Sequence, residues 1–189
     1  KTKKMAFNIN DFRARLKFDG ARNNLFEVQI SNPVDGTFGA KSSFFVRSAQ
    51  LPASQIGFIN VPYFGRFIKI PGDRVFPDWT VTVINDEDFA LRNSLEKWSN
   101  AMSNLKANIR SIQTYTADAI VTQYAKTGQP IRTYKFHNIF PTAISEIPLD
   151  WSSTDAIEEF SVTFQYDYWA IDTTGAPGVA FDETVSSSL

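Results

Sequence analysis

The chain has 189 residues, which suits one well-buried domain and is short for two. Its 43% hydrophobic and 21% charged residues exclude a disordered composition, and its net charge of −1 argues against a protein that grips the nucleic-acid backbone. The absence of cysteine excludes disulfide frameworks and thiolate chemistry, and no apolar run approaches the roughly 18–20 residues of a membrane-spanning helix.

The first third of the chain is expected to hold a short helix followed by strands. Residues 8–18 (NINDFRARLKF) bring three apolar side chains near one stripe, which predicts a short helix that Gly20 ends. Residues 25–31 alternate between apolar and polar side chains, as a half-buried strand does. The next expected elements are a turn-rich loop, an extended segment and a hairpin with an aromatic tip, over 32–39, 43–50 and 55–70.

The periodicity changes in the middle of the chain. Residues 79–85 (WTVTVIN) are rich in β-branched side chains on both faces, which predicts a strand covered on both sides. Helical spacing follows and predicts one helix over about 86–104, with Asn85 or Asp86 as its N-cap. The apolar residues at that spacing are Leu91, Leu95, Trp98 and Met102.

The rest of the chain returns to strands. A pair over 119–125 and 131–138 flanks the turn KTGQ, and the clean alternation of 160–168 predicts a final strand. The sum is a mainly β domain of seven or eight strands with one inserted helix, whose strand edges must be closed by the protein itself or by neighbouring subunits.

Composition divides the chain into three parts: an N-terminal arm, a β domain and a C-terminal arm, over 1–20, 21–169 and 170–189. Beyond Trp169 the chain is rich in Gly, Pro, Ser and acidic residues, which predicts a mobile or partner-dependent tail.

Charge is distributed unevenly between the two ends. The first 22 residues hold seven basic residues against two acidic ones, whereas the chain after Lys135 holds nine acidic residues and no Lys or Arg. Two interpretations stay open: the charges solvate the two ends, or the end of one subunit meets the start of the next.

The search for catalytic groups finds no convergent set. His137 is the only histidine, no Gly-x-Ser-x-Gly sequence accompanies it, and its place in a predicted strand favours a structural role. Asp86, Glu87 and Asp88 lie at the predicted helix start, where carboxylates stabilise the N-terminus, so capping is favoured over an acid–base or metal site.

The stretch GDRVFPDWTVTVINDED (72–88) crowds charged residues ahead of a β-branched run. For Asp73, Arg74 and Asp78, an ion pair that is buried or interfacial and fixes a loop is favoured over catalysis. The candidates for exposure are the aromatic residues Tyr63, Phe64, Trp151 and Trp169. Core packing or subunit contact is favoured for them over a stacking platform for single strands, because such platforms normally lie in a basic groove.

Four motifs carry a resemblance to a known family. They are GDRVFPDWTVTVINDED, AQLPAS, AIVTQYA and EIPLDWSSTDAIEEFSVTFQYDYW. Together they resemble, in the same order and from about residue 21 to 169, the tail tube proteins of T4-like contractile-tailed bacteriophages. The chain departs from shorter members of that family at both ends, before Ala21 and after Trp169.

The resemblance implies a structural function and no cofactor. It implies a β-sandwich or open barrel that completes a continuous barrel in a hexameric ring, with rings stacked into a hollow conduit for the genome. The implied partners are other copies of the chain, the tail sheath protein, and the baseplate and tail terminator proteins. DNA would pass through the lumen without specific binding, and no stable membrane association is expected. The implied location is the virion, after assembly in the cytoplasm of the host bacterium.

No residue is assigned to catalysis or to a metal. The candidates for structural or interface roles are Asp73, Arg74, Asp78, Trp79, Asn85, Asp86, Asp150 and Trp151. From the family, the strands around 43–70 and 118–138 are expected to face a net negative lumen, and the helix to face the sheath. Two alternatives stay open: the inner tube of a non-phage contractile injection system, and a monomeric carbohydrate-binding β-sandwich.

Overall fold

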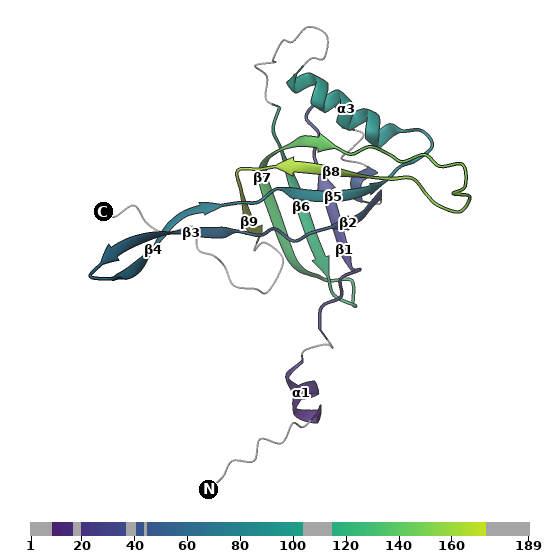
Figure 1. The fold of residues 1–189 in the computed structure, drawn as a ribbon. Helices are drawn as coiled ribbons and strands as arrows, with labels where there is room; N and C mark the ends of the chain where they lie inside the picture. The colour runs from purple at the N-terminus through teal and green to yellow at the C-terminus, as the bar shows by residue number, and fades with distance from the viewer. Residues whose placement is uncertain (1–8, 17–19, 37–40, 44, 104–114, 173–189) are drawn as a thin grey trace.

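The computed structural model describes residues 9–16, 20–36, 41–43, 45–103 and 115–172. Within these residues the fold is mainly β, as the sequence predicts, with the helices α1 (Ile9–Arg15) and α3 (Ala90–Met102) (Figure 1). The strands are β1 (Phe26–Ile30), β2 (Val46–Ala49), β3 (Gln55–Tyr63), β4 (Arg66–Val75), β5 (Trp79–Ile84), β6 (Ala117–Tyr124), β7 (Pro130–Ile144), β8 (Glu159–Gln165) and β9 (Tyr168–Asp172).

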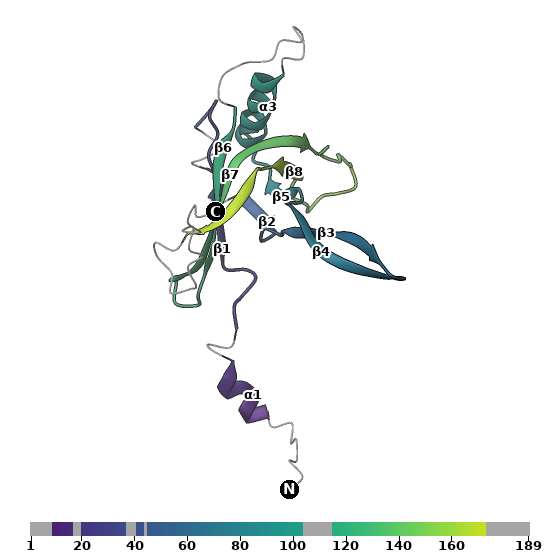
Figure 2. The ribbon, with the colours of Figure 1, turned by 90° about the vertical axis from the view of Figure 1, so that its left-hand side faces the viewer.

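Seven of the strands form one antiparallel, curved sheet. Its order is β1-β6-β7-β8-β5-β2, and β9 also pairs with β7. The two ends of this path approach each other: the backbone N–H of Ile30 at the end of β1 donates to Ser42 Oγ, just before β2, at 3.2 Å. The sheet therefore curls into an open barrel, and α3 packs against β7 beside it (Figures 1 and 2).

Strand β7 belongs to both halves of the barrel. Its first part pairs with β6 and β9, and its last part pairs with β8. Asn138 marks the change with a left-handed φ of 57°, and its Nδ2 donates to Asp167 Oδ2 at 2.6 Å. The single strand expected over 160–168 is therefore wrong: the chain turns at Tyr166 and Asp167, and β9 continues to Asp172.

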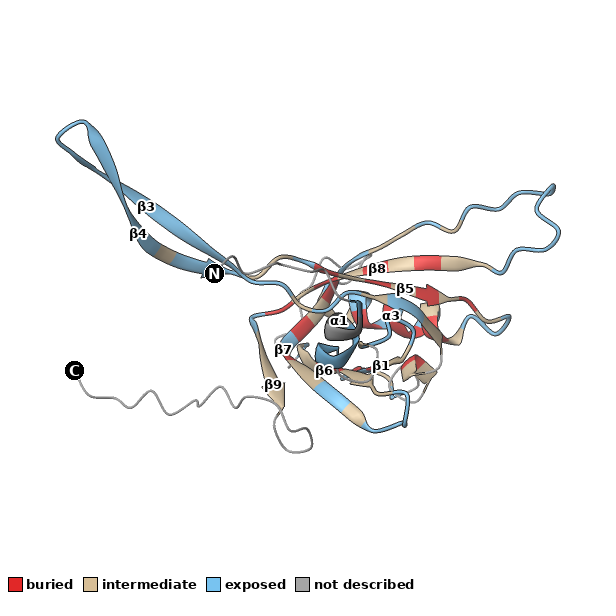
Figure 3. Ribbon diagram, turned by 90° about the horizontal axis from the view of Figure 1, so that it is seen from below, coloured by how far each residue is buried: buried red, intermediate tan, exposed pale blue. Residues whose placement is uncertain are grey.

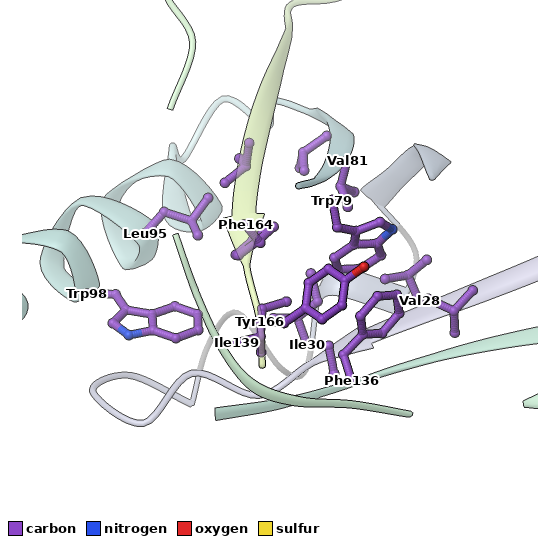
Figure 4. Close-up of a cluster of buried hydrophobic side chains, with 14 of the residues drawn as sticks. Val28, Ile30, Trp79, Val81, Leu95, Trp98, Phe136, Ile139, Phe164 and Tyr166 are labelled. Carbon is purple, nitrogen blue, oxygen red and sulfur yellow. The ribbon is translucent and has the colours of Figure 1, made fainter. Parts of the chain in front are cut away.

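The core is built from aromatic and β-branched side chains of the barrel strands and one face of α3 (Figure 4). Trp79 stacks on Phe136 with ring centroids 4.5 Å apart, and its indole N–H donates to the Gln50 carbonyl at 2.8 Å. In β5, Trp79, Val81 and Val83 are buried, whereas the residues between them are half-buried. The expectation that this strand is covered on both sides is thus met fully on one face only.

The helix is confirmed, but its predicted start is wrong. α3 begins at Ala90, and its buried residues include Leu91, Leu95 and Trp98, which the periodicity identified. Asn85 does not cap it: the backbone N–H of Asn85 donates to the Glu158 carbonyl at 2.8 Å and so extends the pairing of β5 with β8. The N-cap position is held instead by Phe89 in a left-handed conformation, whose own side chain makes no cap, so Asp86 is not the N-cap either. Of the three acidic residues before the helix, Asp88 does bind its start: its Oδ1 accepts a hydrogen bond from the Ala90 backbone N–H at 2.9 Å.

The hairpin is longer than expected. It was predicted over 55–70 with an aromatic tip, and the structure confirms the tip but extends the second strand to Val75. Residues 72–75 therefore lie in β4, and the expectation that Arg74 lies in a loop is wrong. β2 is shorter than the extended segment expected over 43–50, because residues 41–43 are helical. Figures 1 and 3 show β3 and β4 standing out from the barrel.

Candidate assembly surfaces

The β3–β4 hairpin exposes apolar side chains on both of its faces. The cross-strand pairs Ile59–Ile70 and Val61–Ile68 alternate with Phe58–Pro71 and Pro62–Phe67. Successive side chains of a strand point to opposite faces, so each face of the ribbon carries apolar groups. Every residue of β3 is exposed, and in β4 only Gly72 is less than exposed. The hairpin thus buries almost nothing within the chain.

The hairpin tip, defined here as residues 63–67, is strained and aromatic. Phe64 and Gly65 have φ values of 42° and 76°, as in a two-residue type I′ turn. Gly, Asn and Asp are preferred there, because a left-handed conformation costs other residues about 1–2 kcal/mol. Phe64 nevertheless takes this position with 91% of its surface exposed, and its ring meets that of Tyr63 edge-on at 4.7 Å.

The hairpin carries a net positive charge. Its bases are Arg66, Lys69 and Arg74 against the single acid Asp73, so the sum over 55–75 is +3 − 1 = +2. Lys69 Nζ lies 5.1 Å from the centroid of the Phe58 ring, which places a cation beside the exposed aromatic surface.

A second exposed surface is the loop between β7 and β8, residues 145–158. Its base is anchored: the backbone N–H of Ser145 donates to the Ser161 carbonyl at 2.8 Å, and Arg92 of α3 donates to the Ser145 carbonyl at 3.2 Å. Beyond the base the loop extends away from the barrel, with Leu149, Trp151 and Ile157 exposed (Figure 3).

This loop and the ends of β5 and β8 border an open hollow of about 800 Å³, called here the loop pocket. Its apolar lining includes Ile84, Ile147, Leu149 and Ile157. Its charged lining consists of Asp150, Asp155, Glu158, Glu159 and Arg47, a sum of −4 + 1 = −3. The pocket is therefore both apolar and acidic.

Three of the candidate residues were expected to form an ion pair, and the structure separates them. Asp73 and Arg74 are exposed on β4, and no ion pair joins them to each other or to Asp78 among the residues described. Asp78 instead accepts a hydrogen bond from Gln165 Nε2, which ties the start of β5 to the end of β8. The buried alternative is excluded for Asp73 and Arg74, and an interfacial role stays a prediction.

Asn85 and Asp86 hold the segment between β5 and α3. Asn85 Nδ2 donates to Glu158 Oε2 at 2.8 Å, while its buried Oδ1 finds no partner among the described residues. Asp86 lies 3.6 Å and Asp88 2.6 Å from Lys41 Nζ. The hydrogen bond between Lys41 and Asp88 raises the pKa of Lys41 and lowers that of Asp88, so the pair stays charged at neutral pH.

Asp150 and Trp151 lie in the middle of the β7–β8 loop. Asp150 Oδ1 accepts hydrogen bonds from the Ser152 backbone N–H at 2.9 Å and from its hydroxyl at 2.8 Å. These two bonds lower the pKa of Asp150 and fix the turn. Trp151 is fully exposed, at 103% of its reference surface. Of the eight candidates, only Trp79 lies in the hydrophobic core.

Sequence reasoning named Phe64 only among the aromatic residues that could be exposed, without a role of its own, and it missed the loop pocket altogether. The signal for Phe64 was present, since Phe-Gly stands between two apolar runs where a hairpin turn normally has Asn-Gly. The loop pocket has no local signal, because Arg47, Ile84 and Glu159 come from distant parts of the chain.

His137 is half-buried on β7 and does not belong to the hydrophobic core. Its ring stacks on that of Tyr168 with centroids 4.6 Å apart, and its Nδ1 lies 3.7 Å from Asp118 Oδ1. No cluster of three or more His, Cys, Asp or Glu side chains able to hold a metal occurs in the part of the chain that the structure describes. In that same part, no helix is long and apolar enough to span a bilayer.

Comparison with known proteins agrees with these features. The family model for phage tail tube proteins matches residues 8–172. The tail tube protein gp19 of Enterobacteria phage T4 is 36% identical over 154 residues, which cover 80% of this chain and 91% of that protein.

Two solved structures share the fold at low sequence identity. The tube-terminating cap of the anti-feeding prophage has a TM-score of 0.61 at 17% identity, covering 81% of this chain and 91% of that one. The sheath/tube terminator of the extracellular contractile injection system PVC has a TM-score of 0.61 at 15% identity, covering 81% and 96%. The chain belongs to the phage tail tube protein family and is a structural protein of a phage tail.

Proposed function

We propose that this chain assembles into hexameric rings that stack into the hollow tube of a contractile tail and conduct the genome into the host after sheath contraction. The β3–β4 hairpin is the observation that carries this proposal, because it stands outside the barrel with apolar side chains on both faces. A two-stranded hairpin is marginally stable in water by itself, and a large exposed apolar patch marks a protein contact. Neighbouring copies at a fixed repeat would cover it.

The proposed partners are the tail sheath protein around the tube, and the baseplate and tail terminator proteins at its ends. The fold shared with a tube-terminating cap and a sheath/tube terminator supports this assignment. The proposed location is the virion, after assembly in the bacterial cytoplasm. Asp73, Arg74, Asp150 and Trp151 are proposed to lie at contacts between subunits, since all four are exposed. No catalytic role and no cofactor is proposed.

The proposed lumen is net negative. DNA carries one negative charge per roughly 1.7 Å of helix axis, so a basic lining would hold the genome and slow its passage. The strands around 43–70 and 118–138 were expected to line the channel, but their charge sum of +6 − 1 = +5 does not suit a negative lining, so only the position of α3, facing the sheath, is proposed here. A cryo-EM structure of the tube tests this directly, and a channel surface dominated by Lys and Arg would overturn the proposal.

Negative-stain electron microscopy of the purified protein at high concentration and low salt tests the proposed assembly. Hollow rods or six-membered rings are the expected result. Single particles that bind glycans on an array would contradict it and support the carbohydrate-binding alternative.

The inner tube of a non-phage contractile injection system is the second candidate. The fold shared with the anti-feeding prophage and PVC structures favours it. Neighbouring genes discriminate the two: capsid and terminase genes are expected beside a phage tail tube gene and not beside an injection-system gene.

A further inference from the structure

The hairpin tip and the loop pocket lie on opposite sides of the barrel. In both Figure 1 and Figure 3 the β3–β4 hairpin extends to the left, and the β7–β8 loop extends to the right. We propose that the hairpin tip of one copy inserts Phe64 into the loop pocket of the next copy. This inference rests on the proposed self-assembly and names the two surfaces that make it.

Phe64 has the features of an anchor residue. Interface energy concentrates in a few aromatic and Arg side chains that enter desolvated pockets. Phe64 lies in the turn that joins β3 to β4, and Arg66 and Phe67 follow it on β4. Backbone strain of this kind persists where surrounding structure or function maintains it. Within one copy, the surroundings of Phe64 do not maintain its left-handed conformation, because its side chain is almost wholly exposed.

The loop pocket is large enough and apolar enough to receive the Phe64 ring. Its volume of about 800 Å³ lies within the range of roughly 300–1,000 Å³ in which protein pockets take up a group. Ile147, Leu149 and Ile157 supply apolar lining for an aromatic ring. Leu149 and Ile157 are themselves exposed, so filling the pocket buries apolar surface on both partners.

The two surfaces also match in charge. The hairpin sums to +2, with Arg66 and Lys69 nearest its tip, and the pocket lining sums to −3. Opposite charges around an apolar centre speed association and fix the register of a contact. A contact between the hairpins of two copies would instead bring like charges together.

The placement of the two surfaces makes the contact head-to-tail. A contact between two different patches leaves one free hairpin and one free pocket on every growing chain of subunits, so it closes into a ring or propagates as a helix. Both outcomes suit a tube.

Cross-linking tests the contact, because the chain contains no cysteine and introduced thiols are therefore unique. The variants are Tyr63→Cys and Ala156→Cys, which keep the Phe64 ring: Tyr63 adjoins Phe64 at the exposed tip, and Ala156 lines the pocket. A short thiol-reactive cross-linker applied to their mixture is expected to join the two variants as a heterodimer. The double variant is expected to give a ladder, which stops at six copies if the contact lies within a ring and continues if it lies between rings.

Phe89→Cys is the matched control. Phe89 is a second exposed phenylalanine with a left-handed φ, of 50°, and it does not line the pocket. Mixing this variant with Ala156→Cys is expected to give no heterodimer above background. Equal yields of heterodimer from the Tyr63→Cys and Phe89→Cys variants would overturn the inference.

Phe64→Asn separates the contact from the stability of the hairpin. Asn-Gly is the preferred pair for this turn, so the substitution keeps or improves the hairpin while removing the aromatic ring. The critical concentration for assembly is expected to rise about tenfold or more, and Phe89→Asn is expected to leave it unchanged. Normal assembly of the Phe64→Asn variant would reject the proposed contact and leave the proposed function standing. Failure of the wild-type chain to assemble at all would tell against the proposed function, and the cross-linking of concentrated protein would still report on the contact.

Discussion

Two tryptophans of this chain stand in opposite environments. Trp79 is buried beside Phe136 and Phe164, whereas Trp151 is fully exposed on the β7–β8 loop. Trp79→Ala is expected to lower the free energy of unfolding by about 3–5 kcal/mol, since it opens a cavity in the core. Trp151→Ala, the matched control, is expected to change it by no more than about 0.5 kcal/mol. Urea unfolding of unassembled protein measures both, and similar losses would contradict the burial described here.

Glu27 and Tyr124 join β1 to β6 through a hydrogen bond that depends on pH. The Tyr124 hydroxyl donates to Glu27 Oε2 at 2.5 Å, and this bond, with a second from Gln29, lowers the pKa of Glu27. A carboxyl whose pKa is lowered by folding stabilises the protein above its ordinary pKa, and this contribution disappears as the pH falls through the lowered value.

Tyr124→Phe removes the principal donor to that carboxylate. At pH 7 it is expected to lower the free energy of unfolding by about 0.5–1 kcal/mol, because the site is partly solvated. The difference from wild type is expected to shrink below pH 4. Tyr168→Phe is the control, since the Tyr168 hydroxyl makes no hydrogen bond to a described residue. A loss that is independent of pH would show that packing, and not the charged acceptor, is responsible.

At the scale of elements, the hairpin is separable from the barrel. The core cluster contains no residue of β3 or β4, and these two strands form a sheet of their own. Replacing residues 57–72 by a short Gly-rich turn is therefore expected to change the free energy of unfolding by less than about 1 kcal/mol, while abolishing assembly. Chemical denaturation and electron microscopy measure the two effects. A shortened chain that fails to fold, or one that still forms tubes, would contradict this division of roles.

Elements with a strong period were predictable from the sequence. The pairing of β6 with the first part of β7 and the buried face of α3 follow from alternation and from helical spacing, which depend only on neighbours along the chain. The continuation of β7 from residue 139 to Ile144 was not predicted. The turn between β8 and β9 was missed because the alternation of apolar residues continues through it, and Tyr166 stays in the core. The bend of β7 at the left-handed Asn138, where its pairing changes from β9 to β8, lies on the partner strand, so the sequence of residues 160–168 gives no sign of it.

The length of the hairpin was underestimated for a different reason. Pro71 and Gly72 are typical of a turn, so the strand was expected to end before them. In the structure they lie within β4, near a register shift between Ile56 and Phe58 on β3. A Cβ added at Gly72 would meet the backbone of Gly57 at 3.4 Å. The glycines thus allow two strands to approach closely at a β-bulge, which residue preferences do not distinguish from a loop.

At the scale of the whole molecule, charge complementarity implies that assembly depends on salt. In the proposed contact the acidic loop pocket faces the basic hairpin, with charge sums of −3 and +2. Exposed charge pairs are screened beyond about 8 Å at physiological ionic strength. Raising salt from about 50 mM to 1 M is expected to increase the critical concentration severalfold. Light scattering during assembly measures it, and a critical concentration insensitive to salt would show that apolar contacts alone drive assembly.

The connectivity of the barrel has a consequence for the order of events during synthesis. Val28 of β1 pairs with Val121, 93 positions later, and Val81 of β5 pairs with Val162, 81 positions later. Closure of such long loops is slow and must wait until the C-terminal strands leave the ribosome. The β3–β4 hairpin is local and can form within about 1–10 μs, as isolated hairpins do. A nascent chain therefore exposes the apolar β3–β4 hairpin well before the β7–β8 loop that would bind it has been synthesised. Neighbouring nascent chains are expected to associate through their hairpins unless a chaperone covers them.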